Sequence, residues 1–250
     1  GFASREAGLL ALWAVSTVVV PEHFVGPPGM GHGGYVAGIL ARHVEGAVQV
    51  TLRRATPVGV ELVVDVQDDG RVVLHHEGEL IAEAESATLD LDVPPVPDVD
   101  AAVAAEKGSP SHWNELGVHP ICLGCGLARD DDDGLEIAVG PLEIDGHEQV
   151  AAVWRPTAAM AGPDGTVDPQ WVLAALDCPG AMAFIARGTF AGLLGRIVFE
   201  QLAPAEVEVD HIVTGWEIDR DGRKLFAGTA LATTDGTVLA RARATWFERT

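Results

Sequence analysis

Two segments of the chain share one arrangement of polar, glycine and apolar positions. Residues 29–41 begin with glycines around His32 and continue as an apolar run, and residues 165–177 begin with Asp168 and Pro169 and continue in the same way. A short polar or glycine-rich start before an apolar run is typical of a buried helix, and Asp followed by Pro suits a helix cap and first turn. We therefore predict one buried helix in each segment, with His32 and Asp168 at equivalent positions.

Alternating apolar and polar positions follow each predicted helix. They run through residues 48–66 and 77–85 in the first half, and through 197–216 and 235–246 in the second. Asp-Gly pairs, which favour tight hairpin turns, separate these runs at matching places, positions 69–70 and 221–222. Long antiparallel strands after one central helix predict a duplicated α+β unit, in which a curved antiparallel sheet wraps the helix.

Prolines mark the boundary between the two predicted units. Residues 93–118 are rich in proline and read as a linker with one short helix at 101–106. The first unit is then residues 1–92, and the second is residues 119–250. At 250 residues the chain is long enough to bury a sizeable core.

Charge and hydropathy exclude several kinds of partner. A net charge of −21 argues against nucleic acid, whose binding needs a basic face, and it repels anionic membranes. The apolar stretch 8–20 is shorter than a membrane span and has no basic leader, so we expect neither a membrane segment nor a signal peptide.

The cysteines do not form a recognisable framework. Three are present, Cys122, Cys125 and Cys178, and an odd, low count favours a reducing, cytoplasmic location. His119 precedes the single Cys-x-x-Cys pair, but a structural zinc site usually has four ligands from two such pairs. We therefore expect no metal, a tight turn at 119–125, and a small core residue at Cys178.

Gly31-His32-Gly33-Gly34-Tyr35 resembles the His-Gly-Gly helix start of hotdog-fold thioesterases of the phenylacetate-pathway type. In that family an Asp follows nine residues after the His. Asp177 stands nine residues after Asp168, whereas Ala41 holds this place in the first half. The duplication resembles double-hotdog acyl-CoA thioesterases, and the resemblance covers nearly the whole chain outside the linker.

This resemblance implies a double-hotdog hydrolase that cleaves acyl-CoA to free acid and coenzyme A. Sites in the family form between two facing units, so the first-half helix start and Asp177 would form one composite site. The second possible site, where Asp168-Pro169-Gln170 faces Ala41, would be inactive. The resemblance further implies no cofactor other than coenzyme A as part of the substrate, and a homodimer of double hotdogs.

Thioester hydrolysis places negative charge on the carbonyl oxygen, which the free N–H groups of a helix N-terminus stabilise. Gly33 and Gly34 leave the backbone open to a substrate, and the Gly34 N–H is the favoured donor. His32 either positions the carbonyl or caps the helix. Asp177 acts either as a nucleophile or as a general base on water, and burial should raise its pKa. Pro179 should disturb the helix beside this carboxylate.

Residues near the helix start are expected to bind the rest of the substrate. Gly33 and Tyr35 lie in the helix start itself, and Arg53 and Arg54 are candidates for the phosphates of coenzyme A. Two other functions remain open. If the helix start and Asp177, which come from different halves of the chain, form no active site, the protein is a non-catalytic acyl-CoA or acyl-chain binding protein. An enoyl-CoA hydratase or dehydratase is less favoured, because no acid on the first helix accompanies His23.

Overall fold

The strands form one antiparallel sheet around three central helices. The computed structural model describes residues 15–113, 117–129 and 133–249. Of the apolar stretch 8–20, residues 8–14 therefore lie outside the described residues. Within these ranges eleven strands pair in the order β1-β3-β4-β5-β2-β8-β11-β10-β9-β7-β6. Their bounds are β1 Val15–Val19, β2 Val48–Leu52, β3 Glu61–Val66, β4 Val72–His76, β5 Glu79–Ser86, β6 Gly140–Ile144, β7 His147–Trp154, β8 Ala191–Gln201, β9 His211–Asp221, β10 Lys224–Thr233 and β11 Val238–Glu248.

The two halves of the chain meet where β2 pairs with β8. Val48 lies opposite Phe199 and Val50 opposite Ile197 in this antiparallel pair. Read outward from the junction, the first half runs β2-β5-β4-β3-β1 and the second runs β8-β11-β10-β9-β7, with β6 added at the far edge. The two halves therefore contribute strands in the same relative order to one continuous sheet.

The predicted hairpins and strand faces are confirmed. The turns at 69–70 and 221–222 connect β3 to β4 and β9 to β10. In β11, the side chains of Ala240, Ala242 and Ala244 are completely buried, while Arg241 between them is partly exposed. This is the period of two that one buried sheet face requires.

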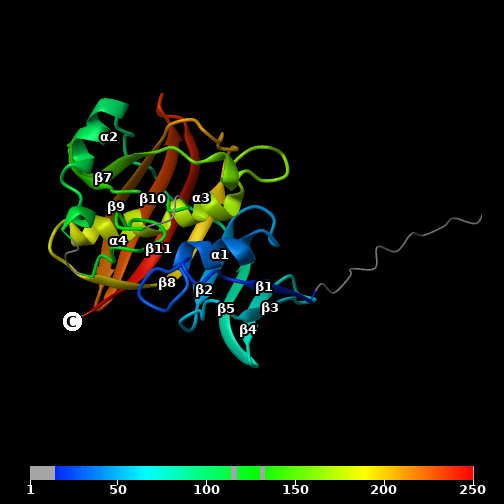
Figure 1. The fold of residues 1–250 in the computed structure, drawn as a ribbon. Helices are drawn as coiled ribbons and strands as arrows, with labels where there is room; N and C mark the ends of the chain where they lie inside the picture. The colour runs from blue at the N-terminus through cyan, green and yellow to red at the C-terminus, as the bar shows by residue number, and fades with distance from the viewer. Residues whose placement is uncertain (1–14, 114–116, 130–132, 250) are drawn as a thin grey trace, which may run out of the picture.

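Helices α1 (Gly33–Ala41) and α4 (Asp177–Ile185) lie against one face of the sheet, and α3 (Pro169–Ala175) packs on both of these helices (Figure 1). Helices α1 and α3 pack antiparallel through glycines. A Cβ atom on Gly34 would lie 2.6 Å from the Cβ of Asp177, and one on Gly38 would lie 2.6 Å from the Cα of Gln170. Because no side chain fits there, the two backbones approach closely and bring the N-terminus of α1 to Asp177.

The second-half helix is broken beside Asp177. The predicted helix through 165–177 starts as expected at Pro169, with the Asp168 carboxylate accepting from the Gln170 N–H, but α3 ends at Ala175 and α4 begins at Asp177. Pro179 lies in the first turn of α4, where its missing N–H would have no helical partner. The break therefore places Asp177 at a helix N-terminus.

The proline-rich segment carries the short helix expected there. Helix α2 (Val99–Glu106) begins two residues before the predicted start, and its cap residue Asp98 accepts a hydrogen bond from the Ala101 N–H at 2.8 Å. It packs on β6 and β7. Short 3-10 turns lie at Pro110–His112 and Ala158–Met160. In the described ranges, none of the helices has the length and apolar character needed to cross a membrane.

Candidate functional site

The structure brings Gly34 and Asp177 into direct contact. The Gly34 N–H in the first turn of α1 donates to Asp177 Oδ2 at 2.6 Å, and both residues are buried. Asp177 is itself the first residue of α4, so its carboxylate lies between two helix N-termini. Free N–H groups and helix dipoles at both ends favour the negative charge.

His32 caps α1 and also faces the carboxylate. Its Nδ1 accepts a hydrogen bond from the Tyr35 N–H at 3.3 Å, as the capping alternative requires. Its Nε2 lies 3.5 Å from Asp177 Oδ2 and 3.4 Å from the Sγ of Cys178. Because Nδ1 accepts, the single proton of the neutral ring lies on Nε2 and points toward Asp177 and Cys178.

Burial and pairing shift the pKa values of both groups. Burial raises the pKa of Asp177 above its usual value, although His32 and the Gly34 N–H oppose the shift. Burial lowers the pKa of His32, but Asp177 and the thiol of Cys122 outweigh it and leave a net rise. Protonation of His32 at Nδ1 would break the hydrogen bond that this atom accepts from the Tyr35 N–H. Asp177 Oδ1 is buried and has no hydrogen-bond partner within the described residues.

A cavity of about 350 Å³ opens beside this pair, and both halves of the chain line it. Gly33 and Leu52 come from the first half, and Met182, Leu194 and Trp246 come from the second. Most of its lining is apolar, with Asp177 and His32 among the few polar groups. An apolar cavity with few polar groups is the usual form of a small-molecule site.

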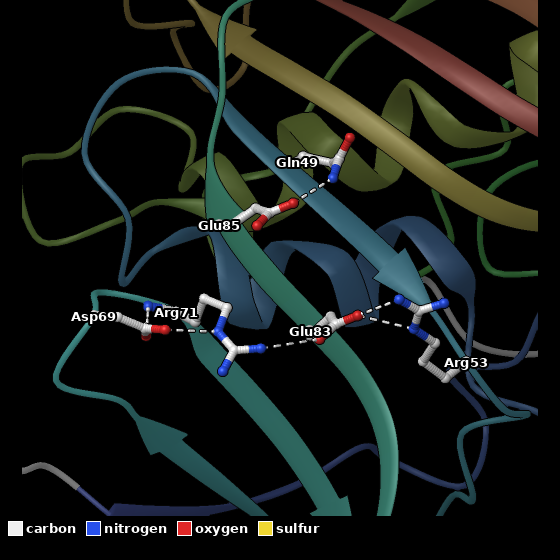
Figure 2. Close-up of polar contacts among 6 residues, drawn as sticks. All are labelled: Gln49, Arg53, Asp69, Arg71, Glu83 and Glu85. Carbon is white, nitrogen blue, oxygen red and sulfur yellow. Dashed lines mark hydrogen bonds and ion pairs between the residues drawn. The ribbon is translucent and has the colours of Figure 1, made fainter.

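Arg53 and Arg54 line the same cavity but are held in ion pairs. The Arg53 Nε donates to Glu83 Oε1 at 2.9 Å, and Arg71 Nη1 lies 3.8 Å from the other oxygen of Glu83 (Figure 2). Arg54 has only a looser pair, with Glu79 at 3.5 Å. Both side chains are about half exposed, so they are available to an anionic ligand.

Tyr35 lies elsewhere than the sequence prediction implied. Its ring packs edge-on against Phe24 and beside Trp171, with ring centroids 4.9 and 5.1 Å apart. The described residues that line the cavity do not include it. Tyr35 contacts the site through its backbone N–H, which donates a hydrogen bond to the cap residue His32.

The site also contains a thiol cluster whose position the sequence did not indicate. The predicted turn at 119–125 is present, and it folds over His32 so that a Cβ on Gly124 would lie 2.8 Å from His32 Nε2. Cys122, Cys125 and Cys178 all line the cavity with His119. The unusual Cys-x-x-Cys spacing was the only sequence signal for this arrangement.

The Nε2 of His32 and the Sγ atoms of Cys122 and Cys178 lie within 4.8 Å of one another, close enough to surround a metal ion. A ligating histidine normally donates its other ring N–H to an acceptor. Here Nδ1 faces the Tyr35 N–H, so Nε2 keeps its proton and has no lone pair for a metal. The tautomer therefore disfavours a metal-ligand role for His32.

In the second half of the chain, a side chain fills the helix-start position that corresponds to Gly34. Gln170 stands where Gly34 stands in α1, and its side chain accepts from Arg42 Nη2 at 2.5 Å. The same Arg42 group lies 3.3 Å from Asp168 Oδ2. Ala41 has no carboxylate to offer, so the groups that meet at Asp177 are replaced here by an amide and an ion pair.

Solved structures of thioesterases share this mostly antiparallel fold over nearly the whole chain. A TesB protein from Mycobacterium avium subspecies paratuberculosis has 12% identity and a TM-score of 0.62, covering 95% of this chain and 94% of that protein. Acyl-CoA thioesterase II TesB2 from Mycobacterium marinum has 14% identity and a TM-score of 0.58, covering 94% and 93%. A candidate thioesterase from Novosphingobium aromaticivorans has 17% identity and a TM-score of 0.64, covering 95% and 96%.

No family model matches the sequence, and no curated protein matches it. At identities this low, the likeness to the solved structures shows a common fold. The resemblance inferred from the His-Gly-Gly segment is therefore confirmed at the level of the fold.

Proposed function

We propose that the protein is a double-hotdog hydrolase, which cleaves acyl-CoA thioesters at one composite site. The observation that carries this proposal is the 2.6 Å hydrogen bond from the Gly34 N–H to Asp177 in the wall of an apolar cavity. The helix start comes from the first half and the carboxylate from the second. The matching strand orders of the two halves and the thioesterase structures with this fold support it.

The geometry changes which backbone group is the better carbonyl donor. The Gly34 N–H, favoured from the sequence, already donates to Asp177. Gly33 lines the cavity, and its N–H has no hydrogen-bond partner among the described residues. We assign the Gly33 N–H to the thioester carbonyl, where it stabilises developing negative charge, and the Gly34 N–H to holding the carboxylate.

Asp177 then acts on the carbonyl carbon in one of two ways. As a general base, it removes a proton from water, which adds to the carbonyl carbon before the coenzyme A thiolate leaves. As a nucleophile, it attacks the carbonyl carbon and the C–S bond breaks, so the coenzyme A thiolate leaves and an acyl-aspartyl anhydride remains, which water then hydrolyses. In both cases the hydrogen bond from the Gly34 N–H holds the carboxylate, and His32 Nε2 faces it from 3.5 Å.

The remaining lining suits the two ends of an acyl-CoA. The apolar cavity accepts the acyl group, while Arg53 and Arg54 attract the nucleotide phosphates. Arg54 is the stronger candidate, because Arg53 is already bound to Glu83. The opposite pseudo-equivalent site remains predicted to be inactive, since Gln170 occupies the helix start there.

Thiol release from a panel of acyl-CoAs tests the proposal. The wild type should release coenzyme A. The rate of release by Asp177→Asn should be about 100- to 10,000-fold lower, as expected for a missing general acid–base group. Asp168→Asn is the matched control, because asparagine also caps a helix and Asp168 lies outside the cavity lining. Undiminished release by Asp177→Asn would refute the assignment of Asp177.

A non-catalytic acyl-CoA binding protein is the second candidate, and one observation favours it. Asp177 Oδ1 is buried without a partner, and Oδ2 is occupied by the Gly34 N–H, so a water molecule has restricted access to the carboxylate. Calorimetry with the same acyl-CoA panel separates the two functions. Tight binding without thiol release supports the binding protein, whereas hydration of an enoyl-CoA would instead identify a hydratase.

A further inference from the structure

Every cysteine of the chain lies at one place, which the proposed hydrolysis does not explain. Cys122 and Cys125 belong to the turn that covers His32, and Cys178 lies in the first turn of α4. All three are free thiols, buried, and part of the cavity lining. Since the sequence has three cysteines in total, this cluster contains the whole thiol content of the protein.

The thiols of Cys122 and Cys178 are in direct contact. The Sγ atoms of Cys122 and Cys178 lie 3.6 Å apart, although the residues are 56 positions apart in the sequence. A disulfide has a sulfur–sulfur distance of about 2.05 Å, so an approach of about 1.5 Å would allow the bond. Because Cys178 is on a packed helix and Cys122 is in a turn, the turn is the part that would move.

The environment gives the two thiols different reactivity. Hydrogen bonds from the thiols of Cys125 and Cys178, together with His32, hold the pKa of Cys122 well below its usual value despite burial. The same contact with Cys122 raises the pKa of Cys178. A thiolate beside a protonated thiol is the arrangement in which one sulfur reacts first and the other resolves the product.

We propose that Cys122 and Cys178 form a redox-active dithiol in the cavity wall, which a hydroperoxide oxidises to a disulfide. The Cys122 thiolate attacks one peroxide oxygen, the O–O bond breaks, and a sulfenic acid forms as the leaving oxygen takes up a proton. The Cys178 sulfur then attacks the sulfenyl sulfur, forming the S–S bond and releasing water. The thiols lose two electrons, and the peroxide is reduced by two.

The disulfide would act directly on the candidate active site. Cys178 follows Asp177 in the chain, and its sulfur lies 3.4 Å from His32 Nε2. Drawing Cys122 toward it pulls the turn that contains Gly124 further onto His32 and into the cavity. The effect on hydrolysis rests on the proposed function, whereas formation of the disulfide does not.

Peroxide treatment, followed by alkylation and peptide mass spectrometry, tests the dithiol. Free thiols should fall from three to one, with a linked peptide pair that contains Cys122 and Cys178. Cys178→Ser should form no link and should leave a Cys122 sulfenic acid that a 1,3-diketone traps. Cys125→Ser is the matched control and should still form the link, because it removes the third thiol, keeps the reacting pair and leaves a hydroxyl that can donate to the Cys122 sulfur.

Two results would overturn the proposal: a link between Cys122 and Cys125 in the wild type, or three alkylatable thiols after treatment. Thiol release from acyl-CoA should fall about 100-fold on oxidation, as for a catalytic group displaced by about 1 Å, and should return with a dithiol reductant. If the reduced protein hydrolyses no acyl-CoA, the proposed function fails, but peptide mapping still decides whether the dithiol exists.

Discussion

Replacing Gly34 with alanine should separate the catalytic contact from the stability of the helix pair. The added Cβ would lie 2.6 Å from the Cβ of Asp177 and 2.7 Å from the carbonyl oxygen of Leu173, where ordinary contact begins at 3.4 Å. The helices must therefore move apart by about 0.8 Å, the difference between 2.6 and 3.4 Å. This lengthens the 2.6 Å hydrogen bond from the Gly34 N–H to about 3.4 Å, beyond the range of about 2.7–3.2 Å for such bonds.

The effect on stability should be small and the effect on activity large. Overpacking costs about 1–3 kcal/mol, and alanine in a helix recovers about 1 kcal/mol relative to glycine. The net loss of about 0–2 kcal/mol lowers the melting temperature by about 0–8 °C in a protein of this size. A displacement near 1 Å at reacting groups costs about 100-fold in rate. Thermal unfolding and kcat/KM for an acyl-CoA, measured below the melting transition, give both quantities.

Gly38→Ala is the matched control, because its Cβ would lie equally close, at 2.6 Å, to the Cα of Gln170. It crowds the same helix pair one turn away from the carboxylate, so it should destabilise similarly while retaining most of the activity. Equal losses of activity in both variants would attribute the effect to helix separation in general. Wild-type activity in Gly34→Ala would show that the contact with Asp177 is not required.

Three further predictions concern ionisation and substrate binding. Because burial raises the pKa of Asp177, the acid limb of the kcat/KM profile should lie above 3.8, the ordinary aspartate value, and Asp177→Asn should abolish the limb in any residual activity. A raised pKa in the folded protein also means that the stability contributed by Asp177 is complete below pH 3.8 and is lost as pH rises through the folded pKa. The melting temperature of Asp177→Asn should therefore increase relative to that of the wild type as pH rises. A difference in melting temperature that does not change with pH would contradict this prediction. Arg54→Ala should raise KM for acyl-CoA several-fold with little change in kcat, and Arg53→Ala should do less, because Glu83 already binds that guanidinium; equal effects would refute the ranking.

The elements could be predicted where the sequence pattern follows their geometry. The alternation in β11 and the Asp-Gly turns reflect one buried sheet face and tight hairpins, so they were predicted correctly. The Asp168-Pro169 cap was also readable, because local hydrogen bonding decides it. The break at Leu176 could be anticipated only as a disturbance near Pro179, since the restart of a helix depends on what packs around it.

The site was only partly predictable, because its members come from distant segments. The repeat register paired the helix start at Gly34 with Asp177, and the structure has these residues in contact. It did not show that the contact occupies the Gly34 N–H and leaves the Gly33 N–H free among the described residues. Nor did it indicate that Tyr35 would pack among aromatic side chains.

The sequence by itself determined the strands, the hairpin turns and the helix cap at Asp168, because these depend on local periodicity and residue type. Only the tertiary structure decided which groups meet. The close approach at Gly34 and Gly38 sets the distance to Asp177, and the fold of the turn around Cys122 brings its thiol to Cys178. Such contacts depend on packing between segments more than 50 positions apart, which no local pattern encodes.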